Sequence, residues 1–215
     1  ALASASSRIA KPARTEASGR LTIAIDAPGK RSRTKVSTTP DRRRRTPDRG
    51  AKPGSTTRGA AHYNLACFLA THGSDMAVVE YGEAIQQDPE YPDAHLNLGL
   101  TLADQGKVDL AVKELERAIT LAPKDAFARH ELATLHMDEG DYRAAIGQLK
   151  EVVRLEGENF EAWLDLGICY AQKGFYAEAE RAYEKAKALN GNDLLLNYNL
   201  AALYALWGKH QAALE

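Results

Sequence analysis

Small and apolar residues recur every 34 positions from residue 59 to the end of the chain. A shift of 34 residues superimposes a leucine that precedes Gly or Ala, a central glycine and a later alanine: Leu98, Leu132, Leu166 and Leu200; Gly106, Gly140, Gly174 and Gly208; Ala111, Ala145, Ala179 and Ala213. The units are residues 92–125, 126–159, 160–193 and the partial 194–215, preceded by a shorter unit at 59–91. A fixed period of this length is typical of a repeat architecture.

Each unit divides at its central glycine into two amphipathic stretches, which predicts a pair of helices. Asp125, Asn159 and Asp193 each precede a helical stretch, where their side chains are suited to cap free backbone N–H groups. Pro92 is suited to a first helical position. Gly or Ala at the eighth position of each unit and Ala at the twentieth allow the paired helices to approach closely. The pattern therefore predicts an all-α solenoid of antiparallel helix pairs, stabilised by stacking between neighbouring units.

The unit 160–193 combines Trp163, Leu166, Gly167, Tyr170, Gly174, Tyr176, Ala179, Tyr183 and Ala186. This combination resembles a near-consensus tetratricopeptide repeat (TPR), and the resemblance covers residues 59–215. Gly157 and Gly191 stand where the family usually has Pro, which weakens single units without affecting the predicted fold. The resemblance implies a TPR domain over residues 59–215 that forms a right-handed superhelical solenoid.

The resemblance also implies a concave surface, lined by the first helix of each unit, that binds a peptide. The sixth residue of each unit would face this surface: Asn64, Asn97, Glu131, Asp165 and Asn199. Asn offers both a donor and an acceptor, so such a ladder can hold a peptide backbone whatever its sequence. The competing interpretation is that these are ordinary polar surface residues.

Neighbouring positions predict which ligand this concave surface prefers. Leu96, Leu164 and Phe127 would supply apolar contacts, and Asp104 and Asp138 would add negative charge. No Lys or Arg falls at the positions that the resemblance turns toward the ligand, so the basic clamp of chaperone-tail-binding TPR domains is not matched. An acidic and partly apolar surface favours a basic or neutral peptide.

Residues 1–58 differ sharply in charge from the rest of the chain. They carry 15 Lys+Arg and 4 Asp+Glu, whereas residues 59–215 carry 13 and 25, so the two parts have net charges of +11 and −12. The first part is poor in large apolar residues, which predicts a disordered basic tail. Its densest charge is the run Arg42, Arg43, Arg44 and Arg45, near the candidate phosphorylation sites Thr39 and Thr46.

Several interpretations of this basic run stay open. The run could bind nucleic acid, act as an import or anionic-lipid patch, or form part of an organellar transit segment. It could equally be a solvated linker. Because opposite charges joined in one chain have a high effective concentration, it could also contact the acidic surface of its own domain.

No phosphate-binding loop, nucleophile elbow or metal-binding helix motif is present in the sequence, so we expect a non-catalytic chain with no cofactor and no metal. The favoured function is a scaffold or adaptor that binds a peptide segment of another protein. One alternative is the substrate-recognition arm of a larger enzyme that continues beyond Glu215, similar to protein O-GlcNAc transferases. Another is an assembly module whose tail binds nucleic acid. The sequence contains no run of eighteen apolar residues, so we expect no transmembrane helix. The cytoplasm is the default location, and an organelle or the nucleus stays open as an alternative.

Overall fold

The computed structural model of the chain describes residues 57–70 and 74–209. Residues 1–56 of the predicted disordered tail, with the four arginines at 42–45 and with Thr39 and Thr46, therefore lie outside the described residues. The last two residues of the predicted tail, Thr57 and Arg58, are helical and begin the first helix, so the tail prediction extended two residues too far. No described helix is long and apolar enough to cross a membrane.

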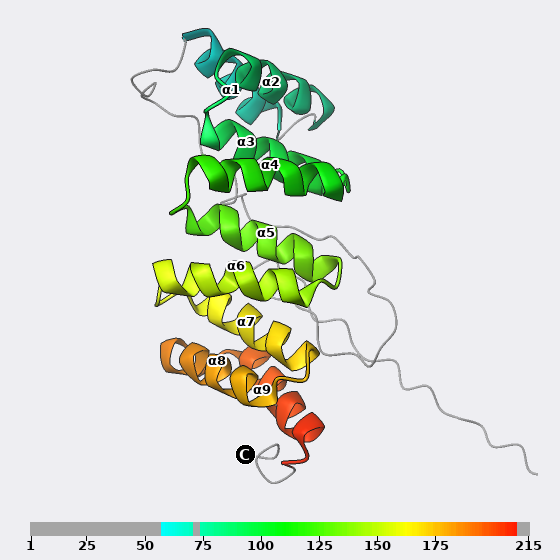
Figure 1. Ribbon diagram of the computed structural model, residues 1–215, viewed down its shortest axis with the longest axis vertical. Coiled ribbons are helices and arrows are strands. Elements are labelled where there is room, and N and C mark those ends of the chain that lie inside the picture. Colours follow the sequence, from blue (N-terminus) through cyan, green and yellow to red (C-terminus); the bar gives the residue numbers. More distant parts are fainter. Residues whose placement is uncertain (1–56, 71–73, 210–215) are drawn as a thin grey trace, which may run out of the picture.

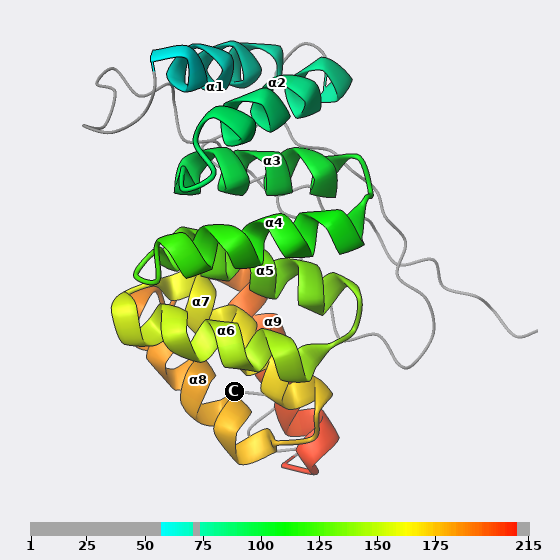
Figure 2. The same ribbon diagram turned by 45° about the horizontal axis from the view of Figure 1, so that its top comes forward.

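The described residues form nine α-helices and no strand. In chain order they are α1 (Thr57–Leu69), α2 (Ser74–Gln87), α3 (Pro92–Asp104), α4 (Val108–Leu121), α5 (Ala126–Asp138), α6 (Tyr142–Leu155), α7 (Phe160–Gln172), α8 (Tyr176–Leu189) and α9 (Leu194–Trp207). The helices stack in chain order from α1 at one end to α9 at the other (Figure 1). Figure 2 shows α1 to α4 following one another at the N-terminal end of the stack. The predicted all-α helix-pair solenoid is confirmed.

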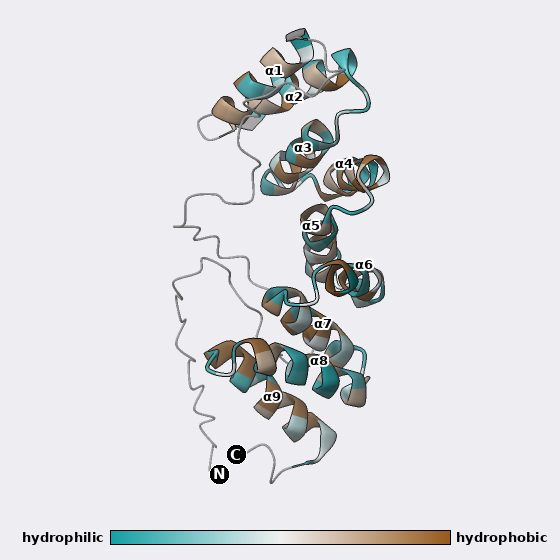
Figure 3. Cartoon of the chain, turned by 90° about the vertical axis from the view of Figure 1, so that its left-hand side faces the viewer, coloured by the Kyte–Doolittle hydropathy of each residue, from teal (hydrophilic) through white to brown (hydrophobic). Residues whose placement is uncertain are grey.

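The two helices of each pair make the most extensive contacts, and these pairs are α1 with α2, α3 with α4, α5 with α6, and α7 with α8. The second helix of each pair then packs on the first helix of the next. Seen nearly along the helices, α3 and α5 lie on one side of the stack and α4 and α6 on the other (Figure 3). The first helices of successive pairs also touch, as α3 with α5 and α7 with α9. The layer of first helices α1, α3, α5, α7 and α9 is called the inner layer below.

Local chemistry explains where the helices begin and end. The side chains of Asp125, Asn159 and Asp193 accept hydrogen bonds from backbone N–H groups in the first turns of α5, α7 and α9, as predicted. Asp141 caps α6 in the same way, which the sequence analysis did not predict. Four central glycines have φ between 76° and 80°, a left-handed conformation that other residues adopt only with strain: Gly106, Gly140, Gly174 and Gly208.

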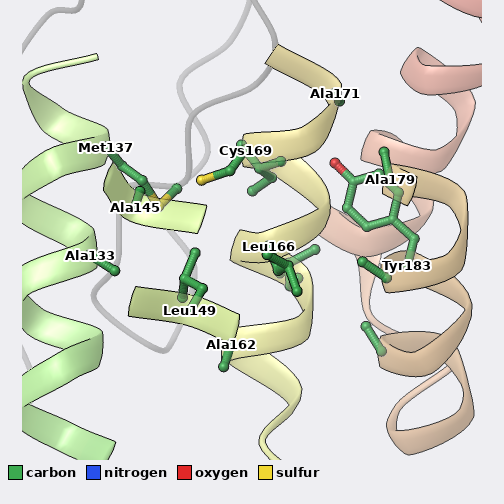
Figure 4. Packing of buried hydrophobic residues seen from close by; sticks show 14 of the residues in the cluster. Ala133, Met137, Ala145, Leu149, Ala162, Leu166, Cys169, Ala171, Ala179 and Tyr183 are labelled. Atoms are coloured by element: carbon green, nitrogen blue, oxygen red, sulfur yellow. The ribbon is translucent and has the colours of Figure 1, made fainter. Parts of the chain in front are cut away.

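Close packing within each pair depends on a small residue on the first helix. A methyl group on Gly167 would overlap the ring of Tyr183, and one on Gly99 would lie only 2.9 Å from Leu115 Cγ. Figure 4 shows Leu149 of α6 between α5 and α7, and Tyr183 of α8 directed toward α7. The core therefore depends on a small residue of the first helix facing a large one of the second.

Helix α5 joins the two halves of the hydrophobic core. Its residues Ala126, Ala133 and Met137 belong to the cluster that extends to α9. Its residues Ala128, Leu132 and Leu135 belong to the cluster that begins at α1. Apolar side chains on both sides of α5 thus connect the N-terminal and C-terminal parts of the described solenoid.

Candidate protein-binding face

The sixth residue of the second unit, Asn97, is fully buried and bonded to the preceding unit. Its Nδ2 donates a hydrogen bond of 3.0 Å to the hydroxyl of Tyr63 on α1 and lies 3.7 Å from Cys67 Sγ. Burial raises the pKa of the Tyr63 phenol, and Cys67 raises it further, so Tyr63 is a neutral partner for the amide. Asn97 therefore connects α3 to α1.

Asp165 makes the corresponding contact between two later units. Nε2 of His130 on α5 donates a hydrogen bond of 2.8 Å to Oδ2 of Asp165 on α7. The Asp165 side chain keeps 16% of its surface exposed, whereas the His130 side chain keeps only 6%. This carboxylate can meet solvent or a ligand while it holds the histidine.

A common rule covers both contacts: the fifth residue of one unit bonds the sixth residue of the next. At the two other joins the fifth residues are Leu96 and Leu164, both buried, where no such bond can form. Their sixth-position counterparts are Glu131, which is largely buried, and Asn199, which is completely buried. Neither polar atom of the Asn199 side chain has a hydrogen-bond partner in the described part of the chain.

The remaining sequence-predicted residues are placed differently. Asn64 is half-buried, with its Oδ1 covered and without a hydrogen-bond partner among the described residues. Phe127 is half-buried in the first turn of α5. Asp104 and Asp138 are exposed, and they are the last residues of α3 and α5. The predicted set is thus partly built into the joins between units and partly open to solvent.

Two further histidines pair with glutamates inside single units. His62 Nδ1 lies 2.6 Å from Glu80 Oε2, and His95 Nδ1 lies 2.7 Å from Glu114 Oε2. His95 and His130, which lie in successive units, thus bond to different partners. No group of three or more His, Cys, Asp or Glu side chains in the described ranges could hold a metal ion.

Sequence reasoning missed the partners of the sixth positions, Tyr63 and His130. A signal was present, because a polar residue at the fifth position of one unit precedes a polar sixth residue of the next in both cases. Reading the two positions together across adjacent units would have found both bonds.

Family models match most of the helical region. A model described as tetratricopeptide repeat matches residues 92–135, another of the same description matches residues 130–193, and a TPR repeat model matches residues 75–106. The chain belongs to the tetratricopeptide-repeat (TPR) family. No curated protein matches this TPR chain.

Solved structures of TPR proteins share the fold. MamA, known from a crystal structure, is 24% identical in sequence to this chain. The match covers 70% of this chain and 88% of the MamA chain, with a TM-score of 0.67. MamA from Desulfovibrio magneticus RS-1 is 19% identical, with coverages of 74% and 91% and a TM-score of 0.70. YrrB, described as a TPR protein with an unusual peptide-binding site, is 21% identical, with coverages of 71% and 79% and a TM-score of 0.66. At these identities the likeness shows the TPR fold alone.

Proposed function

We propose that this TPR chain is a non-catalytic interaction scaffold that binds a basic or neutral peptide segment along its inner layer of first helices. The TPR fold supports this function, since YrrB, which shares the fold, is described as having a peptide-binding site. The observation that carries the proposal is the charge of the inner layer. Its candidate ligand-facing positions include acids on the first helices of three successive units, α3, α5 and α7, and no Lys or Arg. The acids are Asp93, Asp104, Glu131, Asp138, Glu161 and Asp165.

Two of these acids stand where a helix does not favour them. Asp104 ends α3 and Asp138 ends α5, and a negative charge at a helix C-terminus opposes the helix dipole by about 0.3–1 kcal/mol. Both side chains are exposed, so no requirement of the core explains a carboxylate there. Attraction of a basic ligand accounts for acids that recur at the same position of two adjacent units.

The buried members of the predicted set have another role in this proposal. Asn97 holds Tyr63, and Asp165 holds His130, so these residues fix the spacing between first helices. The exposed carboxylates Asp104 and Asp138 then meet the ligand. Phe127, which lies between them in the sequence, supplies the apolar contact. Charge on a rigid inner layer attracts a basic segment without requiring one particular sequence.

Binding of a labelled, end-capped peptide of alternating lysines and alanines, followed by fluorescence anisotropy, tests this function. We expect the wild-type chain to bind it and to bind the matching glutamate peptide far more weakly. The variant Asp104→Lys/Asp138→Lys should lose about tenfold in affinity for the lysine peptide. Lysine at a helix C-terminus agrees with the dipole, so this variant should fold at least as stably as the wild type.

Glu116→Lys/Glu158→Lys is the matched control, because it makes the same change in net charge at two exposed residues outside the candidate positions. It should weaken binding much less than the test variant does. Equal losses in the two variants would show that net charge, not the inner layer, attracts the peptide. Equal affinity for the lysine and glutamate peptides would also reject the proposed preference.

A further inference from the structure

A pocket of about 390 Å³ lies where α6 begins beside the turn from α7 to α8. Arg143, Ile146, Lys173 and Phe175 line it. Figure 1 shows the turn from α5 to α6 and the turn from α7 to α8 on the same edge of the solenoid. The pocket combines two cationic side chains with an aliphatic and an aromatic one, although the helical part of the chain is strongly acidic.

The preceding join has the opposite charge at the equivalent positions. A shift of 34 residues places Asp109 and Glu139 where the pocket has its two cations. It also places Asp141 where the pocket has its aromatic ring and Val112 where it has Ile146. The repeat architecture therefore does not require basic residues at this place. The reversal of charge is a property of one join, between the third and fourth units.

The following join is closed by its own residues. There the equivalent positions are Ala177, Glu180, Trp207 and Lys209. Lys209 Nζ lies 3.2 Å from Glu180 Oε1 and 3.6 Å from the centroid of the Trp207 ring. At this join an ammonium group that lies over an aromatic ring and pairs with a carboxylate therefore occupies the place equivalent to the pocket.

In the pocket itself, no acidic side chain of the described residues pairs with the two cations. The side chains of Arg143 and Lys173 are exposed and form no ion pair or hydrogen bond with another described residue. Phe175 leaves 51% of its surface exposed, although its ring has an edge contact with Tyr170. Two cations and an exposed ring therefore face the same space.

Two of these residues also break local rules that the adjacent unit obeys. Phe175 takes the N-cap position of α8 without a side-chain hydrogen bond, whereas Asp141 caps α6 at the equivalent position. Arg143 puts a cation in the first turn of α6, where the helix dipole favours an anion, and Asp109 stands at its equivalent in α4. Departures from local stability that meet at one place are expected at functional sites.

We propose that this pocket is a second binding site, for a partner-protein segment in which acidic side chains flank an aliphatic or aromatic one. The apolar side chain lies against Ile146 and Phe175, and the carboxylates pair with Arg143 and Lys173. The volume of the pocket is at the low end for ligand sites, which suits one or two side chains of a peptide. The chain thereby joins a basic segment at its inner layer to an acidic and apolar segment at its edge.

The test is binding of the full chain to a labelled, end-capped peptide in which aspartates flank a leucine–phenylalanine pair. The variant Arg143→Glu/Phe175→Asp introduces the residue types that suit the two helix starts. It should keep or raise the melting temperature and lower the affinity for this peptide by about tenfold or more. Loss of binding in a protein of undiminished stability separates the pocket from a failure to fold.

Lys113→Gln/Arg117→Glu is the matched control, since it makes the same change in net charge at two exposed residues of α4. It should leave most of the affinity intact. A peptide with serines in place of leucine and phenylalanine should bind at least about fivefold more weakly, because it offers no apolar side chain to the pocket. Equal losses in both variants, equal binding of the serine peptide, or displacement by inorganic phosphate as effective as by unlabelled peptide would each overturn the proposed site.

Discussion

Nε1 of Trp163 donates a hydrogen bond of 2.8 Å to the backbone carbonyl of Gly157, across the turn that joins two TPR units. The fourth residue of three other units makes the same contact with the carbonyl six residues earlier: His95 with Pro89 at 3.1 Å, Arg129 with Pro123 at 3.0 Å, and Asn197 with Gly191 at 3.4 Å. Four different side-chain types thus secure equivalent turns, because each presents an N–H group at the same point.

The equivalence of these turns predicts that Gly157→Pro stabilises the protein. Glu156, the residue before Gly157, has φ −130° and ψ 79°, almost the same as Ala122 before Pro123, at φ −128° and ψ 77°. The backbone before Gly157 is therefore already compatible with a proline. We expect a gain of about 0.4–1 kcal/mol in the free energy of unfolding, measured by urea denaturation, because proline restricts the unfolded chain. An unchanged or lower stability would show that the two turns differ in a way the dihedral angles do not reveal.

Packing of Gly167 against Tyr183 predicts a strongly coupled pair of substitutions. Gly167→Ala alone should destabilise the protein by about 1–3 kcal/mol, because the new methyl group overlaps the Tyr183 ring. The third unit already carries Ala133 and Leu149 at the equivalent positions. In the Tyr183→Leu background, Gly167→Ala should therefore cost much less. A double-mutant cycle in urea measures the coupling, and additive effects would contradict direct contact between the two sites.

The buried hydroxyl of Tyr183 has no hydrogen-bond partner among the described residues, so Tyr183→Phe should stabilise the protein at pH 7 by about 1 kcal/mol. Burial raises the pKa of the Tyr183 phenol, and Cys169 and Asp165 raise it further. The folded protein thus holds this proton more tightly than the unfolded chain, whose tyrosines titrate near about pH 10. Stability is therefore complete below that pH and falls above it.

Tyr183→Phe removes one contribution to this alkaline loss, so the free energy of unfolding should fall less steeply above about pH 10 in the variant. Tyr63 also has a raised pKa, because it is buried, and it keeps part of the pH dependence in both proteins. Chemical denaturation at a series of pH values measures the difference. Parallel curves for the two proteins would mean that Tyr183 titrates normally.

The repeat made the fold predictable from sequence, whereas the partners of single polar residues were not predictable. Asn159 and Pro92 begin helices as expected, because capping depends on a few adjacent residues. The bond from Asn97 to Tyr63 depends on how two units stack. Position within one unit cannot reveal this, so the predicted ladder did not separate residues that bind the next unit from those open to solvent. The same reason hid the pocket around Phe175, whose residues come from two units.

The basic tail is the remaining hypothesis about the inner layer, and it predicts competition with a basic ligand. Eleven residues separate Arg45 from Thr57, where α1 begins, so the four arginines at 42–45 can reach across about 40 Å when that segment is extended. This reach includes the neighbouring first helices α3 and α5, since packed helices lie about 8–10 Å apart. Replacing the four arginines with glutamine in the full chain should therefore raise the affinity for the lysine peptide about threefold or more at low salt.

Salt and matched variants separate competition at the inner layer from a general effect of charge. The gain should vanish near 1 M salt, where screening limits attraction to about 3 Å. Thr39→Glu/Thr46→Glu should give part of the same gain, because acids beside the run weaken its attraction to Asp104 and Asp138. The control replaces four basic residues farther from the domain with glutamine: Arg8, Lys11, Arg14 and Arg20. If the control raises affinity as much as the change at 42–45, the tail acts through its total charge and does not compete for the inner layer.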